Sequence, residues 1–442
     1  MAFSSDQSRP LAIAVIGAGI TGLSAAWLLS QARHQVTLYE KDARLGGHAN
    51  SVDLPGQSLR VDTGFIVYNE ANYPNFTALM AELGVATQEA DMSFAASLQG
   101  GRIEYASNDL AAFLGGGRNL LSVRFWSMAL DIVRFYKSAK ADVVRGGEGR
   151  TLGAYLDARG YGEAFQCDHI LPMAAAIWSS SLTDMRAYPL EAFVRFFSNH
   201  GLLRLANQPA WRTIAGGSRM YVDALRDRLQ AEIVTGRAIG RVTPLVGGVE
   251  VRDARGEARM FDRVLIASHS DQALAMLANP DAEQRRILSA VPYRTNRAVL
   301  HTDASFMPRR RGTWASWNYV GESAQEGCAI TYWMNRLQSL RTPAPLFVTL
   351  NPTREPEGVL WDGAYEHPCF SVDALRAQRD IWSIQGRGGV WFAGAWLGAG
   401  FHEDGLQAGL AAAEAMGGAR RPWSVAAESS RLALPSVLAD AA

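Results

Sequence analysis

The sequence predicts an α/β fold in which a domain built on a parallel sheet is interleaved with a second domain of mixed sheet and a helical insertion. Three observations lead to this prediction. An apolar run, a glycine-rich turn and a helical stretch follow one another near residues 11–31, and related patterns return near residues 213–234 and 390–415. The segments between them differ in composition. With 442 residues, of which 48% are hydrophobic, the chain can bury two substantial cores.

Charge and cysteine content exclude several classes of function. Lys and Arg together number 43, as do Asp and Glu, and no long run of one sign occurs, so we predict no nucleic-acid partner. The three cysteines, Cys167, Cys328 and Cys369, are far apart in the sequence, which predicts no metal site and no redox pair. The polar N-terminus and the lack of a long apolar run predict a cytoplasmic protein without a signal peptide or membrane span.

The N-terminal motif has the spacing of a dinucleotide site. The apolar run Leu11–Ile16 has the pattern of a buried parallel strand, and it meets a Gly-x-Gly-x-x-Gly turn before a helical stretch. In a Rossmann-like domain the first glycine permits the tight turn, the second lets a pyrophosphate approach the backbone, and the third allows close packing of helix on strand. The predicted contacts are Gly17, Gly19, Ile20, Thr21 and Gly22.

An acidic residue follows at the position that such a site requires. The second predicted strand, Gln35–Tyr39, ends at Glu40, whose carboxylate would accept hydrogen bonds from the adenosine ribose. Arg44, Gly46 and Gly47 then complete an E-x-x-x-R-x-G-G string, which a domain that binds only NAD does not need.

This string resembles the FAD-dependent amine oxidase and phytoene desaturase superfamily. The sequence is particularly similar to bacterial NAD/FAD-binding proteins encoded near cyclopropane-fatty-acyl synthases and to flavin-dependent fatty-acid isomerases and desaturases. The resemblance implies a FAD-binding domain of the glutathione-reductase type, in which Arg44 meets the pyrophosphate and Gly46 and Gly47 let the chain pass close to the flavin. His48 follows, where amine oxidases usually have an arginine. It is either a proton carrier or a surface or supporting histidine.

Two further segments resemble motifs of the superfamily. Val61–Phe65 is similar to the D-x-G turn whose backbone faces the isoalloxazine, which implies a contact from Gly64. The segment Thr213–Ser218 and the helix and strand after it are similar to the family's glycine pair and adenine-side elements, where Ile239 replaces the usual valine. A hairpin with its turn at Asp253–Gly256 then leads to another buried strand.

The C-terminal motif resembles the segment that holds the flavin's ribityl chain and pyrimidine edge. The buried strand Val390–Gly394 leads to Gly400–Gly409 and an alanine-rich helix, whose positive N-terminal end would stabilise negative charge on a reduced flavin. Phe401 aligns with a tyrosine of the amine-oxidase aromatic cage, and His402 is a candidate proton carrier. The implied cofactor contacts are Gly394, Glu403 and Asp404.

The inserted regions have different patterns. Residues 72–201 predict a mostly helical insertion, in which Leu120–Val144 combines aromatic and basic residues on an amphipathic helix. Such a helix can lie on the inner face of a membrane, cover an apolar substrate mouth, or simply pack on the core. Residues 271–386 are rich in tryptophan and predict the sheet of a substrate domain. The expected division is a FAD-binding domain at 1–71, 202–270 and 387–420, a substrate-binding domain at 72–201 and 271–386, and a C-terminal tail at 421–442.

The substrate is less clearly specified than the cofactor. Amine oxidases usually hold a lysine near flavin N5, yet none occurs here after Lys140, and Asn296 or Arg297 stands in the corresponding segment. The expected apolar walls are Trp178, Tyr188, Phe193, Phe196, Phe197 and Phe401. His402 and His48 are the expected proton carriers, and His301 is more typical of a core histidine.

We therefore predict a FAD-dependent oxidoreductase that transfers a hydride from an apolar, fatty-acyl lipid to flavin N5, giving desaturation or double-bond isomerisation. An amine or protoporphyrinogen-type oxidase is the enzyme alternative. A non-catalytic lipid-binding escort is the alternative of another class. Cys369 lies 25 residues before Gly394, near the separation at which some amine oxidases bond flavin covalently. The residues around it differ from that attachment sequence, so we expect non-covalent FAD.

Overall fold

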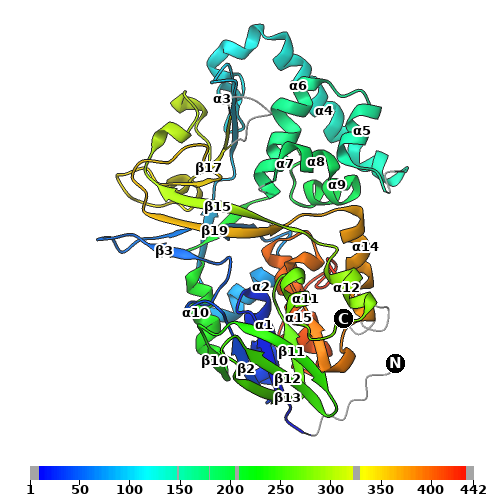
Figure 1. The fold of residues 1–442 in the computed structure, drawn as a ribbon. Helices are drawn as coiled ribbons and strands as arrows, with labels where there is room; N and C mark the ends of the chain where they lie inside the picture. Colours follow the sequence, from blue (N-terminus) through cyan, green and yellow to red (C-terminus); the bar gives the residue numbers. More distant parts are fainter. Residues whose placement is uncertain (1–8, 147–148, 179, 205–208, 322–328, 435–442) are drawn as a thin grey trace.

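The computed structural model describes residues 9–146, 149–178, 180–204, 209–321 and 329–434. The polar N-terminus up to residue 8, Cys328 and residues 435–442 of the predicted tail lie outside the described residues. In Figure 1 helices α1, α10 and α15 lie at one end of the molecule and helices α4 to α9 at the other, with strands β15 and β19 between them.

A parallel sheet forms one end of the molecule and confirms the predicted α/β class. Its strand order is β10-β2-β1-β14-β20, and all neighbouring strands are parallel. Helix α1 is buried along nearly its whole length because it packs against both this sheet and α15. The elements are β1 (Ala12–Ile16), α1 (Ile20–Gln31), β2 (Gln35–Tyr39), α10 (Arg219–Arg228), β10 (Ala231–Val234), β14 (Arg263–Ile266), β20 (Val390–Phe392) and α15 (His402–Ala415).

A second, seven-stranded sheet crosses the middle of the molecule. Its order is β19-β15-β18-β17-β16-β7-β8, and only the β16–β7 pair is parallel. The long pair β15 and β19 forms the edge that faces the parallel-sheet end (Figure 1). The strands are β7 (Phe94–Leu98), β8 (Ile103–Ala106), β15 (Tyr293–His301), β16 (Trp317–Gly321), β17 (Ala329–Trp333), β18 (Phe347–Leu350) and β19 (Trp361–Pro368).

Helices form the far end, as predicted, but the insertion is less helical than the sequence suggested. Strands β7 and β8 lie within it and join the large sheet, and β6 joins a smaller one. These strands were not predicted because they are short, and β7 (FAASL) is rich in alanine, which favours strands weakly. The helices are α2 (Pro74–Leu83), α3 (Leu110–Phe113), η1 (Gly115–Leu121), α4 (Val123–Val144), α5 (Leu152–Ala158), α6 (Glu163–Phe165), η2 (Gln166–Ile170), α7 (Leu171–Trp178), α8 (Leu182–Ala187) and α9 (Leu190–Asn199).

Smaller sheets and short helices complete the fold. Strands β11 (Ile239–Leu245), β12 (Gly248–Asp253) and β13 (Ala258–Phe261) form the predicted hairpin region, β3 (Ser51–Asp53) pairs with β4 (Arg60–Asp62), and β9 (Trp211–Ile214) lies between β5 (Val67–Asn69) and β6 (Thr87–Ala90). The remaining elements are α11 (Ser270–Met276), α12 (Ala282–Leu288), η3 (Ala304–Phe306), η4 (Arg311–Thr313), α13 (Met334–Leu337), α14 (Val372–Asp380), η5 (Ile381–Ser383), η6 (Arg387–Gly389) and η7 (Ala395–Leu397). In the described part of the chain, no helix is long and apolar enough to cross a membrane.

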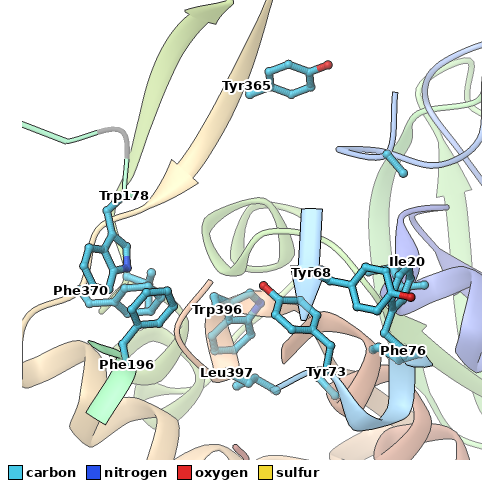
Figure 2. Close-up of a cluster of buried hydrophobic side chains, with 14 of the residues drawn as sticks. Ile20, Tyr68, Tyr73, Phe76, Trp178, Phe196, Tyr365, Phe370, Trp396 and Leu397 are labelled. Atoms are coloured by element: carbon cyan, nitrogen blue, oxygen red, sulfur yellow. The ribbon is translucent and has the colours of Figure 1, made fainter. Parts of the chain in front are cut away.

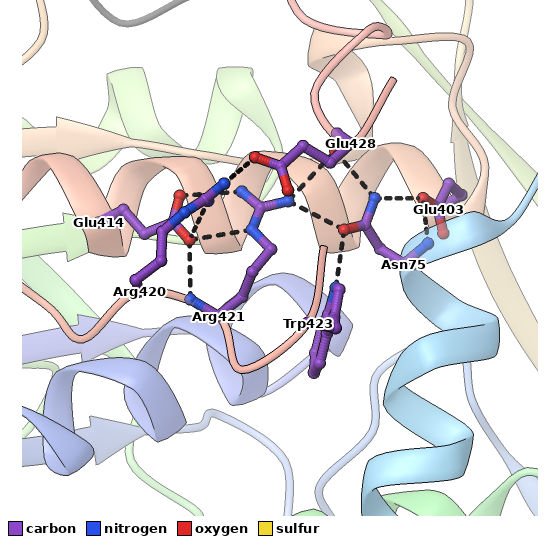
Figure 3. Close-up of polar contacts among 7 residues, drawn as sticks. All are labelled: Asn75, Glu403, Glu414, Arg420, Arg421, Trp423 and Glu428. Atoms are coloured by element: carbon purple, nitrogen blue, oxygen red, sulfur yellow. Dashed lines mark hydrogen bonds and ion pairs between the residues drawn. The ribbon is translucent and has the colours of Figure 1, made fainter. Parts of the chain in front are cut away.

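The described part of the predicted tail is packed against the rest of the chain. The buried side chain of Arg421 donates to Glu414 on α15 at 2.9 Å and to Asn75 Oδ1 on α2 at 2.9 Å. Trp423 stacks on Trp27 of α1, with ring centroids 6.0 Å apart. Figure 3 shows this polar network, which joins α2, α15 and residues 420–428. The segment therefore stabilises the end of the molecule that carries the parallel sheet.

Candidate functional site

The glycine turn between β1 and α1 has the geometry of a phosphate-binding loop. A Cβ atom added at Gly22 would lie 1.7 Å from the carbonyl oxygen of Gly17, so only glycine fits there without moving the backbone. At Gly19, in contrast, no atom lies within 4 Å of an added Cβ. No side chain caps the N-terminus of α1. Its first N–H groups are therefore free to bind an anion, and the space beside Gly19 lets that anion approach.

Glu40 lies at the end of β2, next to this turn. Its side chain accepts a hydrogen bond from the backbone N–H of Ala18 at 2.7 Å and another from Asp42 at 3.0 Å. The carboxylate thus fixes the glycine turn, a role that the sequence analysis missed. The segment before Ile239 lies beside it, since the N–H of Arg237 donates to the carbonyl of Glu40 at 2.9 Å. Ile239 begins β11 two residues after this contact, and its contact with the adenine half stays a prediction.

Arg44 folds back over the second glycine turn. Its guanidinium donates to the carbonyl of Gly47 at 2.8 Å, and no carboxylate pairs with it among the described residues. Gly46 N–H donates to Ala18 O at 2.8 Å, which joins this turn to the first one. An unpaired guanidinium next to a helix N-terminus is well suited to a pyrophosphate.

Gly64 holds the D-x-G turn against the same region. An added Cβ would lie 2.1 Å from the carbonyl of His48, so the two chain segments touch through their backbones. Asp62 fixes this turn to neighbouring segments. Its buried carboxylate accepts hydrogen bonds from Ser218 N–H at 2.9 Å and Gln338 Nε2 at 2.7 Å. Burial raises the pKa of Asp62 to about 6, although the hydrogen bonds from Ser51 and Ser218 act in the opposite direction.

His48 belongs to a cluster of histidines that the sequence did not reveal. Its ring centroid lies 5.4 Å from that of His367, 6.4 Å from that of His269 and 5.1 Å from that of Tyr365. Burial, followed by the neighbouring His367 and His269, lowers the pKa of His48 well below its usual range. Strand β19 supplies Tyr365 and His367, so the cluster joins the glycine turns to the large sheet.

Asn296 sets the tautomer of His367. The amide of Asn296 accepts a hydrogen bond from Asn351 Nδ2 at 2.7 Å and its own Nδ2 donates to His367 Nδ1 at 2.8 Å. His367 Nδ1 is therefore an acceptor, and its proton resides on Nε2. Burial lowers the pKa of His367 to about 4, so the ring is neutral near pH 7.

Arg297, the other residue expected to replace the missing lysine, points away from the cluster. Its guanidinium is ion-paired at the surface with Glu355 at 2.7 Å and Asp362 at 2.6 Å. Of the two candidates, only the buried Asn296 faces the histidines.

The C-terminal helix α15 begins with side chains that support the fold. Glu403 is buried and accepts hydrogen bonds from Phe76 N–H at 2.9 Å and Asn75 Nδ2 at 2.8 Å, which caps the N-terminus of α2. Asp404 accepts from Phe401 N–H at 2.8 Å and pairs with Arg431 at 3.0 Å. Both carboxylates are thus already bonded within the protein, and a flavin contact from these positions would come from their backbone N–H groups.

The side chain of His402 is buried and fixed by its neighbours. Its ring stacks on Phe65 at a centroid distance of 3.7 Å, and its Nε2 lies 2.7 Å from the hydroxyl of Tyr221. Burial lowers the pKa of His402 to about 3. Because this nitrogen is already bonded to Tyr221, His402 is poorly suited to carry protons. His301 is likewise a core residue, bonded to Thr349 at 2.7 Å.

The expected apolar walls form one continuous aromatic cluster. The ring centroid of Phe196 lies 4.7 Å from that of Trp178 and 4.6 Å from that of Phe401, so α7, α9 and the start of α15 meet there. Phe193 and Phe197 stack on each other at 4.1 Å and are fully buried behind Trp178. Figure 2 shows Trp178 and Phe196 on one side of Trp396 and Leu397, with Tyr68 and Phe76 on the other. Tyr188 also packs on Trp178, at 4.7 Å.

Two further residues bear on the predicted cofactor site: Gly394, an expected contact, and Cys369, which we expect not to bond the flavin. At Gly394 an added Cβ would lie 2.5 Å from the indole of Trp396, which requires the small residue there. Cys369 is a free, half-buried thiol whose backbone N–H donates to Pro292 O at 2.8 Å. Burial raises the pKa of this thiol, which makes it less reactive.

An uncapped helix N-terminus, two glycine turns in contact and an unpaired arginine together fit the pyrophosphate of a dinucleotide. The fold and this site are typical of the Rossmann-like class of dinucleotide-binding proteins. The family model for flavin containing amine oxidoreductases matches residues 20–360. The chain therefore belongs to this family and is a FAD-dependent oxidoreductase.

Solved structures support the fold over nearly the whole chain. A CLA-producing fatty acid isomerase from P. acnes has a TM-score of 0.67 at 16% identity, covering 93% of this chain and 99% of the isomerase. Cyclohexylamine oxidase from Brevibacterium oxydans IH-35A has a TM-score of 0.67 at 14% identity, covering 92% of this chain and 99% of that one.

Sequence matches to curated relatives are short. The L-amino-acid oxidase of Pseudechis australis is 52% identical over 44 residues, which is 10% of this chain and 8% of the oxidase. The 4,4'-diapophytoene desaturase of Staphylococcus aureus (strain Newman) is 36% identical over 66 residues, 15% of this chain and 13% of the desaturase. The matched segments thus cover far less than two thirds of either relative.

Proposed function

We propose that the chain oxidises or isomerises an apolar lipid-like substrate, with a fatty-acyl chain as the most suitable class. The observation that carries this proposal is the aromatic cluster of Trp178, Phe196 and Phe401, which lies at the start of α15 beside the predicted flavin site. An apolar chain would bury against these rings, whereas a charged amine would find no carboxylate in the cluster. The names of two similar proteins, a fatty acid isomerase and a diapophytoene desaturase, support a lipid-like substrate.

In this proposal the predicted cofactor residues hold FAD non-covalently. The backbone around Gly17, Gly19 and Gly22 and the side chain of Arg44 would bind the pyrophosphate, and Glu40 would bind the ribose. We assign these roles to a domain made of residues 1–71, 202–270 and 387–420, whose segments supply all five strands of the parallel sheet. When bound, FAD supplies a hydride acceptor at its N5 atom.

The chain's own residues then orient the substrate and exclude water. Trp178, Phe196 and Phe401 would fix the apolar chain, because aromatic rings bury a large area at little cost in side-chain entropy. The Nε2 N–H of His367 would be available to donate a hydrogen bond, because Nδ1 already accepts one from Asn296. His48 lies next to it and would move a proton, and we prefer it to His402 for that role.

Anaerobic flavin reduction tests the proposal directly. The purified yellow protein is mixed without oxygen with unsaturated fatty acids and their thioesters, and absorbance near 450 nm is followed while mass spectrometry detects loss of two hydrogens or a shifted double bond. Bleaching or a shifted double bond with these lipids, and no response to cyclohexylamine or putrescine, is the expected result. Rapid bleaching by the amines alone would instead establish the second candidate, an amine oxidase, which the similarity to cyclohexylamine oxidase favours.

We also propose a cytoplasmic location with access to lipid at the membrane face, because a fatty-acyl substrate partitions into bilayers. Fractionation of cells into soluble and membrane pools, at low and high salt, measures this property.

A further inference from the structure

Exposed apolar side chains are concentrated at one tip of the molecule. In the described part of the chain, seven of the fourteen exposed large hydrophobic side chains lie between residues 110 and 144. Leu121 is 95% exposed, Val123 84% and Leu130 70%, and their grouping in one patch is typical of an interaction surface. We call the group Leu110, Leu120, Leu121, Val123, Trp126 and Leu130 the apolar tip.

The tip is a built surface rather than a frayed loop. Most of its residues line one open hollow at the start of α4, and the indole N–H of Trp126 donates to the carbonyl of Leu120 at 2.9 Å. Phe113 of α3 packs on Phe125 of α4 with ring centroids 5.1 Å apart, which fixes the elements beneath it. The opposite face of α4 is buried in the core. The helix therefore has a packed face and an apolar face left uncovered.

Cations lie on and beside the elements that carry the apolar tip. Arg118 lies within η1, Lys137 and Lys140 follow along α4, and the run Arg309–Arg311 is anchored beside η1 because Arg310 donates to Gly115 O at 3.3 Å. Among the described residues, no carboxylate lies within ion-pair distance of Arg118, Lys137, Lys140, Arg309 or Arg311.

The nearby acidic groups do not neutralise this charge. Asp131 is paired with Arg134 at 3.2 Å, and Glu104 is buried and 3.5 Å from Arg310. Asp109 is exposed and caps α3. The whole chain has a formal net charge of zero, so the excess of cations is a local property of this tip.

We propose that the apolar tip docks on an anionic lipid bilayer, with its leucines, valine and tryptophan in the headgroup region and the surrounding cations on lipid phosphates. Apolar insertion and charge attraction act together in such docking, and neither alone gives stable binding. The proposal is independent of the redox chemistry, because it rests only on this surface.

Vesicle sedimentation of the FAD-loaded full chain tests the proposal. We expect binding to vesicles of phosphatidylglycerol and phosphatidylcholine, weak binding to phosphatidylcholine alone, and loss of binding at high salt. Leu121→Ser combined with Val123→Ser should lower the partition coefficient by about tenfold or more, as loss of two inserted apolar side chains implies. Arg118→Gln combined with Arg309→Gln should lower it by about tenfold on anionic vesicles only.

Matched controls lie at the other end of the molecule. Leu245→Ser with Val246→Ser, on the exposed β11–β12 turn, and Arg241→Gln with Arg255→Gln should leave binding unchanged. Unchanged flavin absorbance in every variant shows that the proteins are folded. If wild type fails to bind anionic vesicles, or the Leu121/Val123 variant binds as wild type does, the proposal is wrong. A wild-type dimer that the same variant makes monomeric, without vesicle binding, would instead assign the tip to contact between two copies.

Discussion

The predicted cofactor side and the predicted substrate side of the site are built in different ways. The cofactor side consists of backbone: the turns at Gly17–Gly22 and Gly46–Gly47 touch each other and leave N–H groups and space. The substrate side consists of side chains from distant segments, such as Trp178 and Phe401, which only the tertiary fold brings together. The first kind of site is specified by short local motifs, and the second by the packing of the whole molecule.

This difference predicts different responses to mutation. A backbone site tolerates almost no added atoms but depends little on the chemistry of its side chains. A side-chain site can lose one ring and keep its fold while it changes what it binds. The following predictions test this contrast, beginning with the largest expected effect.

Gly22→Ala should destroy the flavoprotein, whereas Gly19→Ala should leave it folded. The added methyl at Gly22 meets the Gly17 carbonyl at 1.7 Å, so we expect a loss of about 4 kcal/mol or more in the free energy of unfolding. At Gly19 the methyl has space, so the free energy of unfolding of the flavin-free protein should change by only about 0.5 kcal/mol. Urea unfolding and flavin content measure the two effects. Full flavin occupancy in Gly19→Ala would show that no pyrophosphate approaches that residue.

Arg44→Ala should weaken FAD binding more than Arg44→Lys. A guanidinium can form two parallel hydrogen bonds to a phosphate and an ammonium cannot, so we expect a loss of about 2 to 3 kcal/mol for alanine and less for lysine. Flavin titration of the stripped protein gives both values. Equal affinity in all three proteins would exclude Arg44 from the pyrophosphate site. Glu40→Gln should weaken FAD binding by about 1 to 3 kcal/mol, partly because Glu40 also accepts the hydrogen bond from the Ala18 N–H.

Acid should destabilise the fold through His402. In the unfolded chain a histidine has a pKa near 6.5, whereas burial holds the pKa of His402 at about 3. The unfolded state therefore takes up a proton below pH 6.5 that the folded state does not, and stability falls as the pH decreases from about 6.5 towards 3. At pH 5 this single residue should lower the free energy of unfolding by about 2 kcal/mol relative to pH 7. Urea midpoints of wild type and His402→Gln at both pH values test this, and equal pH dependence in the two proteins would contradict it.

Affinity for the substrate should increase with the length of its apolar chain. Each methylene that leaves water contributes about 0.8 kcal/mol until the aromatic cluster is filled. Phe196→Ala should reduce this increment, because Phe196 contacts both Trp178 and Phe401. Dissociation constants for a series of fatty acids, read from flavin absorbance changes, give the increment. A flat series in wild type would argue against a fatty-acyl substrate.

The sequence predicted the parts of the fold that depend on local pattern. The strand, turn and helix around Gly17–Gly22 lie where the spacing placed them, and the aromatic walls expected from α7, α9 and Phe401 do meet. The histidine cluster could not be predicted, because His367 on β19 meets His48 only in the tertiary fold. For the same reason the sequence could not choose between Asn296 and Arg297. Neighbouring residues on a strand point to opposite faces, and only the observed register shows which one is inside.

The order of strands in the parallel sheet also determines how late in synthesis this sheet can be completed. Strands β1 and β2 emerge from the ribosome early, but β20 and α15, which cover the same sheet and helix, emerge only with residues 390–415. Until then the hydrogen-bonding edge of β14 and one face of α1 lack the partners that cover them in the folded protein. The nascent chain must therefore carry an unfinished parallel sheet through nearly its whole translation, which is the interval in which chaperone contact is most useful.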